Sequence, residues 1–127
     1  MKVLGIDIGG TGIKGALVDL PSGEILTDHL HWPTPQPATP GAVSAVIKKM
    51  IGHFQFNGPV GVGFPGVIRR GVVGSATNLS PVWIGKNAEK IFKKSARLPF
   101  VVINDADAAG IAEMSYGAGK KEKGTVV

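Results

Sequence analysis

Two short apolar runs joined by glycines open the chain. Residues 2–8 are mostly apolar and stop at the glycine pair 9–10, and residues 13–19 form a second run directly afterwards. Runs of this length around a glycine turn predict a β-hairpin. A turn at residues 21–23 precedes a third run at residues 24–31. The opening therefore predicts a meander of three antiparallel strands.

A proline-rich connector follows at residues 32–40, because proline cannot continue a central strand or sit inside a helix. Thr39 can cap the next helix with Pro40 in its first turn. Apolar side chains then recur at three- and four-residue steps, which predicts an amphipathic helix over residues 41–55. These apolar positions are Val43, Val46, Ile47, Met50, Ile51 and Phe54.

The middle of the chain predicts short strands and a second helix. Residues 60–64 form a strand after a turn at residues 57–59. Residues 67–73 turn back as a short hairpin, and residues 76–85 form a loop. Asn87 caps a helix with lysines on its outer face. The inner face of this helix carries Ala88, Ile91, Phe92 and Ser95.

The C-terminal part begins with a continuous apolar run at residues 100–103, the pattern of a strand covered on both faces. Residues 106–116 are rich in alanine and predict a helix. Residues 117–123 read as a loop, and residues 124–127 begin another strand. The whole pattern predicts an α/β domain whose mixed sheet has antiparallel N-terminal hairpins and is flanked by helices.

Composition narrows the functional classes. The 127 residues fit one domain, and a hydrophobic fraction of 43% provides for a core. The absence of cysteine excludes disulfides, thiolate zinc sites and cysteine nucleophiles. No apolar run approaches the roughly 20 residues of a membrane-spanning helix, and the first strand begins too early for a signal peptide. We therefore expect a cytoplasmic protein without a membrane partner.

The charge balance leaves two interpretations open. The net charge is +5, and basic residues gather at residues 86–97 and 120–123. Such clusters favour a polyanionic partner, and they are also typical of a solvated helix face.

The glycine turn after the first strand has the composition of a phosphate-binding loop. Residues without a Cβ atom let backbone N–H groups converge on an anion. Threonine adds a hydroxyl donor, lysine adds a cation, and an aspartate carboxylate suits hydrated Mg²⁺. The residues concerned are Asp7, Gly9, Gly10, Thr11, Gly12 and Lys14. A plain structural hairpin is the alternative.

Residues 10–15 also match the G-x-G-x-x-G dinucleotide motif, with Asp28 near the expected distance downstream. That motif needs a helix to open at its last glycine. Only five residues separate Gly15 from Pro21. A crossover helix does not fit in this space, so the phosphate hairpin is the favoured interpretation.

A second group of candidate functional residues lies at residues 101–109. Here an apolar run, predicted to be a strand, is followed by Asn104 and Asp105 at its carboxyl end. Ligands of open α/β sheets collect at such ends. Asp105 can accept the proton of an alcohol that attacks phosphorus, and Asn104 can bond a neighbouring hydroxyl. The alternative is that Asp105 only caps the helix that begins at Ala106.

In order, these blocks resemble the actin/hexokinase-like sugar kinases, and specifically the family of repressors, open reading frames and sugar kinases with its bacterial polyphosphate-using branch. The glycine turn alone has low specificity, whereas the ordered set covers the chain from end to end. The matching blocks are residues 5–15, 61–66, 78, 83–85, 104–109 and 113–119. The resemblance implies a ribonuclease-H-like fold.

The resemblance further implies transfer of a phosphoryl group from polyphosphate or ATP to the 6-hydroxyl of glucose, with Mg²⁺ as cofactor. Asp105 is then the catalytic base, Asp7 positions the metal, and Asn78, Asn104 and Asp105 bind the sugar. The donor phosphates are held by Gly9, Gly10, Thr11, Gly12 and Lys14.

Such kinases have two similar domains around the site. By resemblance, residues 1–123 form the N-terminal phosphate- and sugar-binding domain, and residues 124–127 begin a second, missing C-terminal kinase domain. We expect the isolated chain to be inactive and the full-length protein to be a homodimer without a nucleic acid partner.

Several alternatives stay open. An ATP-only sugar kinase is the nearest one, and a non-catalytic sugar-sensing regulator is the alternative from another class. Gly66 and Trp83 can line the sugar pocket, or they can be a turn glycine and a core aromatic. His29 and His31 share a strand face, but no third ligand accompanies them for a metal site.

Overall fold

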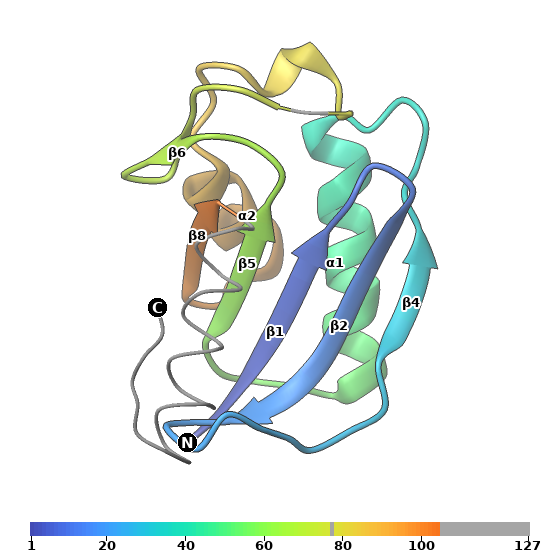
Figure 1. Cartoon of the computed structure of the whole chain (residues 1–127), viewed down its shortest axis with the longest axis vertical. Helices are drawn as coiled ribbons and strands as arrows, with labels where there is room; N and C mark the ends of the chain where they lie inside the picture. Colours follow the sequence, from blue (N-terminus) through green and yellow to red (C-terminus); the bar gives the residue numbers. More distant parts are fainter. Residues whose placement is uncertain (77, 105–127) are drawn as a thin grey trace, which may run out of the picture.

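The computed structural model describes residues 1–76 and 78–104 and contains a six-stranded mixed sheet (Figure 1). The strand order is β3-β2-β1-β5-β8, and β4 also pairs with β2. β1 is antiparallel to β2 and parallel to β5, which is parallel to β8. The strands are β1 (Lys2–Ile8), β2 (Gly12–Asp19), β3 (Glu24–Ile25), β4 (Leu30–Pro33), β5 (Val60–Phe64) and β8 (Phe100–Asn104).

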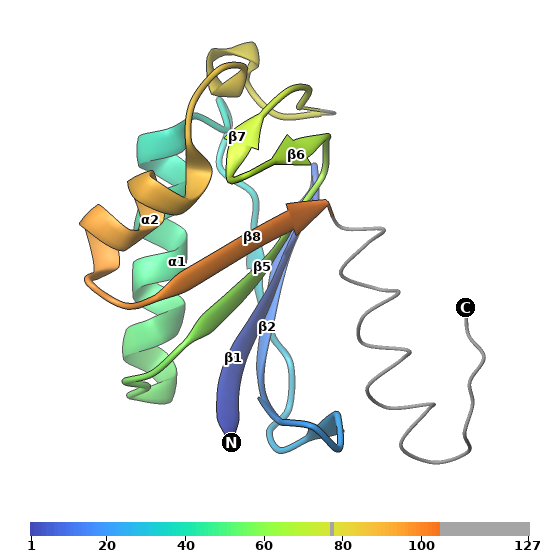
Figure 2. The ribbon, with the colours of Figure 1, turned by 90° about the vertical axis from the view of Figure 1, so that its left-hand side faces the viewer.

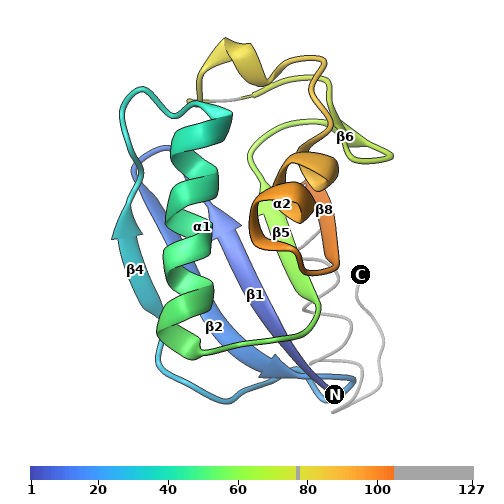
Figure 3. The same ribbon diagram turned by 180° about the vertical axis from the view of Figure 1, so that it is seen from behind.

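Two helices cover one face of this sheet, as Figures 2 and 3 show from the side and from behind. A separate two-stranded hairpin and a short 3-10 helix lie between β5 and the second helix in the chain. These elements are α1 (Pro40–Phe54), β6 (Ile68–Arg69), β7 (Val72–Val73), η1 (Pro81–Trp83) and α2 (Ala88–Ala96). No helix among the described residues is long and apolar enough to cross a membrane.

The caps of both helices are those that the sequence predicts. The Thr39 hydroxyl accepts the Ala42 N–H of α1 at 3.3 Å, and Pro40 occupies the first turn. The Asn87 side chain accepts the Lys90 N–H of α2 at 3.0 Å. A cap of this kind contributes about 1 kcal/mol to helix stability. α1 therefore begins and ends within one residue of its predicted range.

The core lies between the sheet and the two helices. Alternate residues of β1, β5 and β8 point into it, which is the two-residue period of a strand. Aromatic rings extend the core under α2: Trp83 contacts Phe64 edge-on at 5.0 Å between ring centroids and lies 5.8 Å from Phe92. Burying one large apolar side chain contributes about 1.5–3 kcal/mol, so this cluster fixes η1 and α2 against the sheet.

The predicted N-terminal hairpin is confirmed, and the dinucleotide interpretation is wrong. β1 and β2 pair in register from Lys2 with Asp19 to Ile8 with Ile13. The residues after Gly12 continue as strand β2, where the dinucleotide motif would require a helix. The hairpin predicted at residues 67–73 is also present, as β6 and β7.

The predicted third strand is wrong as one continuous element. It is split into β3 and β4, because the Thr27 hydroxyl accepts the Leu17 N–H at 3.1 Å in place of a backbone carbonyl. The predicted connector also begins two residues too early. Trp32 and Pro33 belong to β4, an edge strand, where a proline is tolerated.

Two predictions near the C-terminal edge need correction. The predicted loop at residues 76–85 contains η1, which Ser80 caps by accepting the Val82 N–H at 3.3 Å. β8 is not covered on both faces by the described residues, since both described helices pack on one side and the Val101 side chain is 59% exposed. The helix, loop and strand predicted after residue 104 lie outside the described residues.

Candidate active site

The parallel strands β1, β5 and β8 end at the same edge of the sheet (Figure 1). Of the predicted site residues, Asp7 and Asn104 lie near these strand ends. Asp7 of β1 lies beside Gly63 of β5, which lies beside Ile103 of β8. Phe64 pairs with Asn104 one residue further along. The carboxyl ends of parallel strands are where ligands of open α/β sheets bind.

The glycine turn between β1 and β2 has its carbonyl groups tied back by the segment after β4. The Thr34 hydroxyl donates to the Gly9 carbonyl at 2.6 Å, and the Thr34 N–H donates to the Thr11 carbonyl at 3.1 Å. Gln36 Nε2 donates to the Gly10 carbonyl at 3.2 Å. The turn therefore directs three oxygens, which would repel an anion, toward this segment.

The N–H groups of the turn are used differently. The Gly9 N–H donates to the Gly12 carbonyl at 2.9 Å and so closes the turn. Within the described part of the chain, no backbone hydrogen bond uses the N–H of Gly10 or Thr11. A turn with occupied acceptors and two unused donors is a favourable place for an anion.

The predicted sugar residue Asn78 lies against this predicted phosphate turn. A Cβ atom placed on Gly10 would lie 2.6 Å from the Cβ atom of Asn78, so only glycine fits there. Asn78 has a φ of 62°, a left-handed conformation that asparagine tolerates better than most residues. Residues 10 and 78 are far apart in sequence, and their contact joins the two halves of the predicted site.

Asn104 also lies at this edge, where its side-chain amide donates a hydrogen bond to the Gly66 carbonyl. Gly66 itself has no room for a Cβ atom, because the Ser75 carbonyl occupies that space. Its glycine is thus explained by the turn after β5. Asp105, the predicted base, follows Asn104 in the chain and lies outside the described residues.

A row of polar side chains crosses the sheet on the face opposite the helices. Lys14 of β2 pairs with Asp7 of β1 on one side and with His31 of β4 on the other. Paired residues of neighbouring strands point to the same face. All three are exposed. A carboxylate and a lysine thus lie side by side next to the glycine turn.

Comparison with known proteins assigns this arrangement to a family. A model of the ROK family matches residues 3–127. The chain belongs to the ROK family. The polyphosphate glucokinase of Mycobacterium tuberculosis is 48% identical over 124 residues, which are 97% of this chain and 47% of that protein. The glucokinase of Streptomyces coelicolor is 35% identical over 130 residues, or 97% of this chain and 38% of that protein.

Solved structures agree with this assignment of the ROK chain. The inorganic polyphosphate/ATP-glucomannokinase from Arthrobacter sp. strain KM has a TM-score of 0.86 and 45% identity, over 93% of this chain and 49% of that one. A ROK family glucokinase from Streptomyces griseus in complex with glucose and AMPPNP has a TM-score of 0.79 and 33% identity, over 94% of this chain and 38% of that one. The expected actin/hexokinase-like, ribonuclease-H-like fold is confirmed. The ROK chain spans about half the length of these relatives or less.

Sequence reasoning missed the two residues that hold the turn of this ROK domain. Thr34 and Gln36 lie in the stretch interpreted only as a connector. The signal available was two polar side chains placed between prolines, which fix the backbone around them. Trp83 is a core residue and not a pocket wall: it is fully buried, and its Nε1 donates to the Ala38 carbonyl at 2.9 Å.

The carboxylate beside the glycine turn is of a kind that can hold Mg²⁺. Among the described residues no group of three histidine, aspartate or glutamate side chains could hold a metal ion. Mg²⁺ commonly keeps several waters and is bound through one or two carboxylates plus substrate phosphates. Asp7, exposed beside the glycine turn, meets that requirement.

The lysine-rich face of α2 is separate from this edge. Lys90, Lys93, Lys94 and Arg97 are all exposed, and α2 packs on the face of the sheet opposite the Asp7 row. Within the described residues none of these side chains forms an ion pair. The basic side chains of α2 and Lys14 of β2 therefore lie on opposite faces of the sheet.

Proposed function

We propose that this chain is the N-terminal domain of a sugar kinase that transfers a phosphoryl group from polyphosphate or ATP to the 6-hydroxyl of glucose. The observation that carries the proposal is the glycine turn, whose carbonyl groups are tied back while the Gly10 and Thr11 N–H groups have no backbone acceptor among the described residues. The names of the M. tuberculosis and Arthrobacter relatives support polyphosphate as donor and a hexose as acceptor.

The proposed roles follow from the chemistry of phosphoryl transfer, in which positioning and charge neutralisation supply most of the catalysis. Gly9, Gly10, Thr11 and Gly12 hold the donor phosphates, and Lys14 neutralises their charge. Asp7 holds Mg²⁺, which when bound neutralises further charge on the phosphates.

Asn78 and Asn104 orient the sugar in this proposal. Asp105 is the residue after Asn104 in the sequence, and in this proposal it accepts the proton of the 6-hydroxyl as the oxygen attacks phosphorus. The Asn104 side-chain amide donates to the Gly66 carbonyl, and this hydrogen bond holds Asn104 at the carboxyl end of β8.

The two-domain organisation is part of the proposal. Residues 1–123 form one wall of the site, and a second domain that begins near residue 124 supplies the other. The complete protein is proposed to be a cytoplasmic homodimer that acts without nucleic acid.

The test compares residues 1–127 with a complete protein that continues past Val127. Glucose 6-phosphate formation is measured with polyphosphate and with ATP in each case. We expect the complete protein to use polyphosphate and the isolated chain to give no measurable turnover, because half of the site is missing. Robust phosphorylation by residues 1–127 would refute the two-domain proposal, and a complete protein active with ATP alone would make it an ATP glucokinase.

A further inference from the structure

His31 is placed beside the proposed phosphate turn by the strand register. β4 pairs with β2 at the edge of the sheet (Figure 1). In this register His31 lies directly opposite Lys14, and Pro33 lies opposite Gly12. Because directly paired residues share a face, the imidazole points to the same side of the sheet as the lysine. β4 is an edge strand, so β2 is its only neighbour in the described sheet.

The imidazole of His31 also covers Gly12. A Cβ atom on Gly12 would overlap the ring at Nε2 and would lie 2.9 Å from Cε1. The outer nitrogen of the ring is therefore the atom that reaches the turn. This contact gives a reason for glycine at position 12, where the backbone has no positive φ.

The ring is available to a ligand. His31 is exposed, and among residues 1–76 and 78–104 neither ring nitrogen has a hydrogen-bond partner. The charged groups facing it are Lys14 on β2 and, one strand further, Asp7 on β1; His29 is the nearest titratable residue in its own segment. Histidine is the side chain whose charge ordinarily changes between about pH 5 and pH 8.

We propose that His31 is a phosphate-binding residue that extends the donor cradle from the glycine turn onto β4, an inference that rests on the proposed function. Cross-strand neighbours have Cβ atoms about 5 Å apart. Lys14 and His31 therefore contact neighbouring phosphate groups of one linear tri- or polyphosphate. Protonated His31 donates a charge-assisted hydrogen bond from Nε2, so it binds the donor more tightly at low pH.

The 127-residue chain, labelled for NMR, tests this directly. Tripolyphosphate and, in a second arm, ATP are titrated with Mg²⁺ at about pH 6 and about pH 8, values on either side of ordinary histidine titration. Amide signals of Gly10 and Thr11 report binding at the turn. The variants are His31→Gln, His31→Lys and Lys14→Met, with His29→Gln as the matched control.

We expect wild type to bind tripolyphosphate about three- to tenfold more tightly than His31→Gln at the lower pH, and equally at the higher one. His31→Lys should bind tightly at both pH values, which separates a charge effect from a folding defect. His29→Gln should match wild type. Because phosphates also titrate, the comparison is made between variants and not between pH values alone.

Each other outcome is decisive. If His31→Gln binds like wild type while the Gly10 and Thr11 signals still respond, the role of His31 is refuted and the phosphate turn stands. If those two signals do not respond in wild type, the phosphate turn and the role of His31 are refuted together. If His31→Gln weakens the affinity for tripolyphosphate but not for ATP, His31 binds polyphosphate donors specifically. If it weakens both affinities equally, His31 binds any triphosphate.

Discussion

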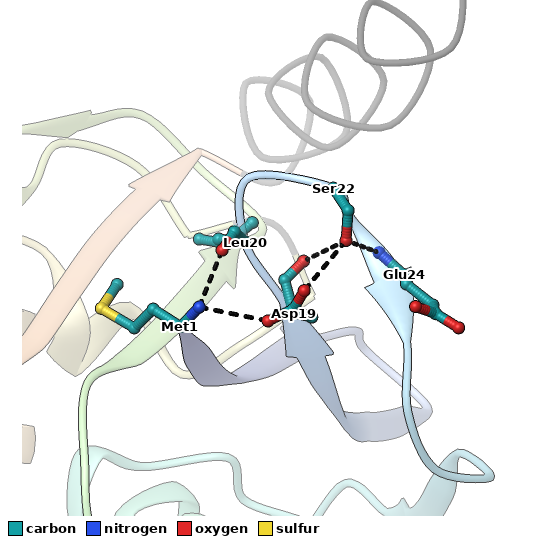
Figure 4. Close-up of polar contacts among 5 residues, drawn as sticks. All are labelled: Met1, Asp19, Leu20, Ser22 and Glu24. Carbon is teal, nitrogen blue, oxygen red and sulfur yellow. Dashed lines mark hydrogen bonds and ion pairs between the residues drawn. The ribbon is translucent and has the colours of Figure 1, made fainter.

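Each end of the β1–β2 hairpin places an aspartate near a cationic group, in different surroundings. Near the glycine turn, Asp7 lies opposite Lys14. At the other end the Met1 ammonium contacts Asp19 Oδ1 at 3.1 Å, as Figure 4 shows. Both pairs are exposed, and neither would be singled out by charge alone.

The Asp19 end is a closed network. Ser22 Oγ donates to Asp19 Oδ2 at 3.2 Å and accepts the Glu24 N–H at 3.2 Å, while the Met1 ammonium also donates to the Leu20 carbonyl at 2.8 Å (Figure 4). These hydrogen bonds all join groups of residues 1–24, so the network stabilises local structure.

The turn end is arranged in the opposite way. Its carbonyl groups are occupied by donors from Thr34 and Gln36, while the N–H groups of Gly10 and Thr11 have no backbone acceptor in the described structure. The difference shows that an anion site is recognised by the N–H donors that the folded backbone does not use in hydrogen bonds. Composition alone does not reveal this.

The largest effect is expected on turnover, when the proposed catalytic base Asp105 is replaced. Asp105→Asn in the complete protein should lower turnover about 10²- to 10⁴-fold, because the proton acceptor is lost. Sugar affinity should stay within about tenfold, since asparagine keeps the hydrogen-bonding shape. Steady-state kinetics with glucose check both values. The control is Asp28→Asn, an exposed aspartate away from the turn; near-normal turnover of Asp105→Asn would make that residue a helix cap.

A second change tests the packing that makes the turn end distinct. Gly10→Ala places a methyl group 2.6 Å from the Asn78 Cβ, so the turn and the Asn78 segment must separate. We expect a loss of about 1–3 kcal/mol in unfolding free energy and weaker tripolyphosphate binding. Urea unfolding and the NMR titration measure these two quantities.

The matched control for that change is Gly52→Ala. A Cβ atom on Gly52, inside α1, meets no atom within 4 Å. Alanine is the better helix former, so this variant should gain about 0.5–1 kcal/mol. If Gly10→Ala also gained stability and bound tripolyphosphate normally, the contact with Asn78 would not shape the site.

A third change tests whether the basic side chains of α2 bind polyphosphate in addition to the glycine turn. Replacing Lys90, Lys93, Lys94 and Arg97 of α2 by glutamine should flatten the salt dependence of the Michaelis constant for polyphosphate, by about one in slope for each phosphate group that these side chains neutralise in wild type. The constant for ATP should respond less, because a single nucleotide cannot reach from the turn to the opposite face. Equal slopes for both donors in all proteins would show that these residues form only a solvated helix face.

The sequence predicted the elements whose causes are local. The glycine turn, the Thr39 and Asn87 caps and the apolar period of α1 all depend on neighbours within a few residues, and all are present. The split of the third strand was not predictable in this way. It depends on the Thr27 hydroxyl reaching Leu17 across the sheet.

The candidate site likewise contains residues that local sequence could predict and residues that it could not. The composition of the turn marked Asp7, Gly10 and Lys14, and the family comparison confirms the class of protein to which the turn belongs. The partners that orient the turn come from later in the chain: Thr34 lies 25 residues after Gly9, and Gln36 lies 26 residues after Gly10. Only the strand register brings those side chains to the turn, so their roles appear first in the structure.

The smallest effect is expected at the closed end of the hairpin. The hydrogen bond from the Met1 ammonium, followed by that from the Ser22 hydroxyl, lowers the pKa of the Asp19 carboxyl below its usual value. A carboxyl with a lowered folded pKa stabilises the protein above its ordinary pKa of about 3.9, and this contribution is lost as the pH falls through the folded value. Asp19→Asn should therefore be slightly less stable than wild type at neutral pH.

The acid limit separates this explanation from a packing effect. Unfolding midpoints of wild type and Asp19→Asn should converge at strongly acidic pH, because both side chains are then uncharged. The difference at neutral pH should be small, since exposed ion pairs contribute little. Tripolyphosphate binding should not change, because the network at Asp19 has no group directed toward the turn. A stability difference that persisted unchanged into acid would attribute the effect to lost hydrogen bonds with Ser22, and a change in tripolyphosphate affinity would mean that the two ends of the hairpin are coupled.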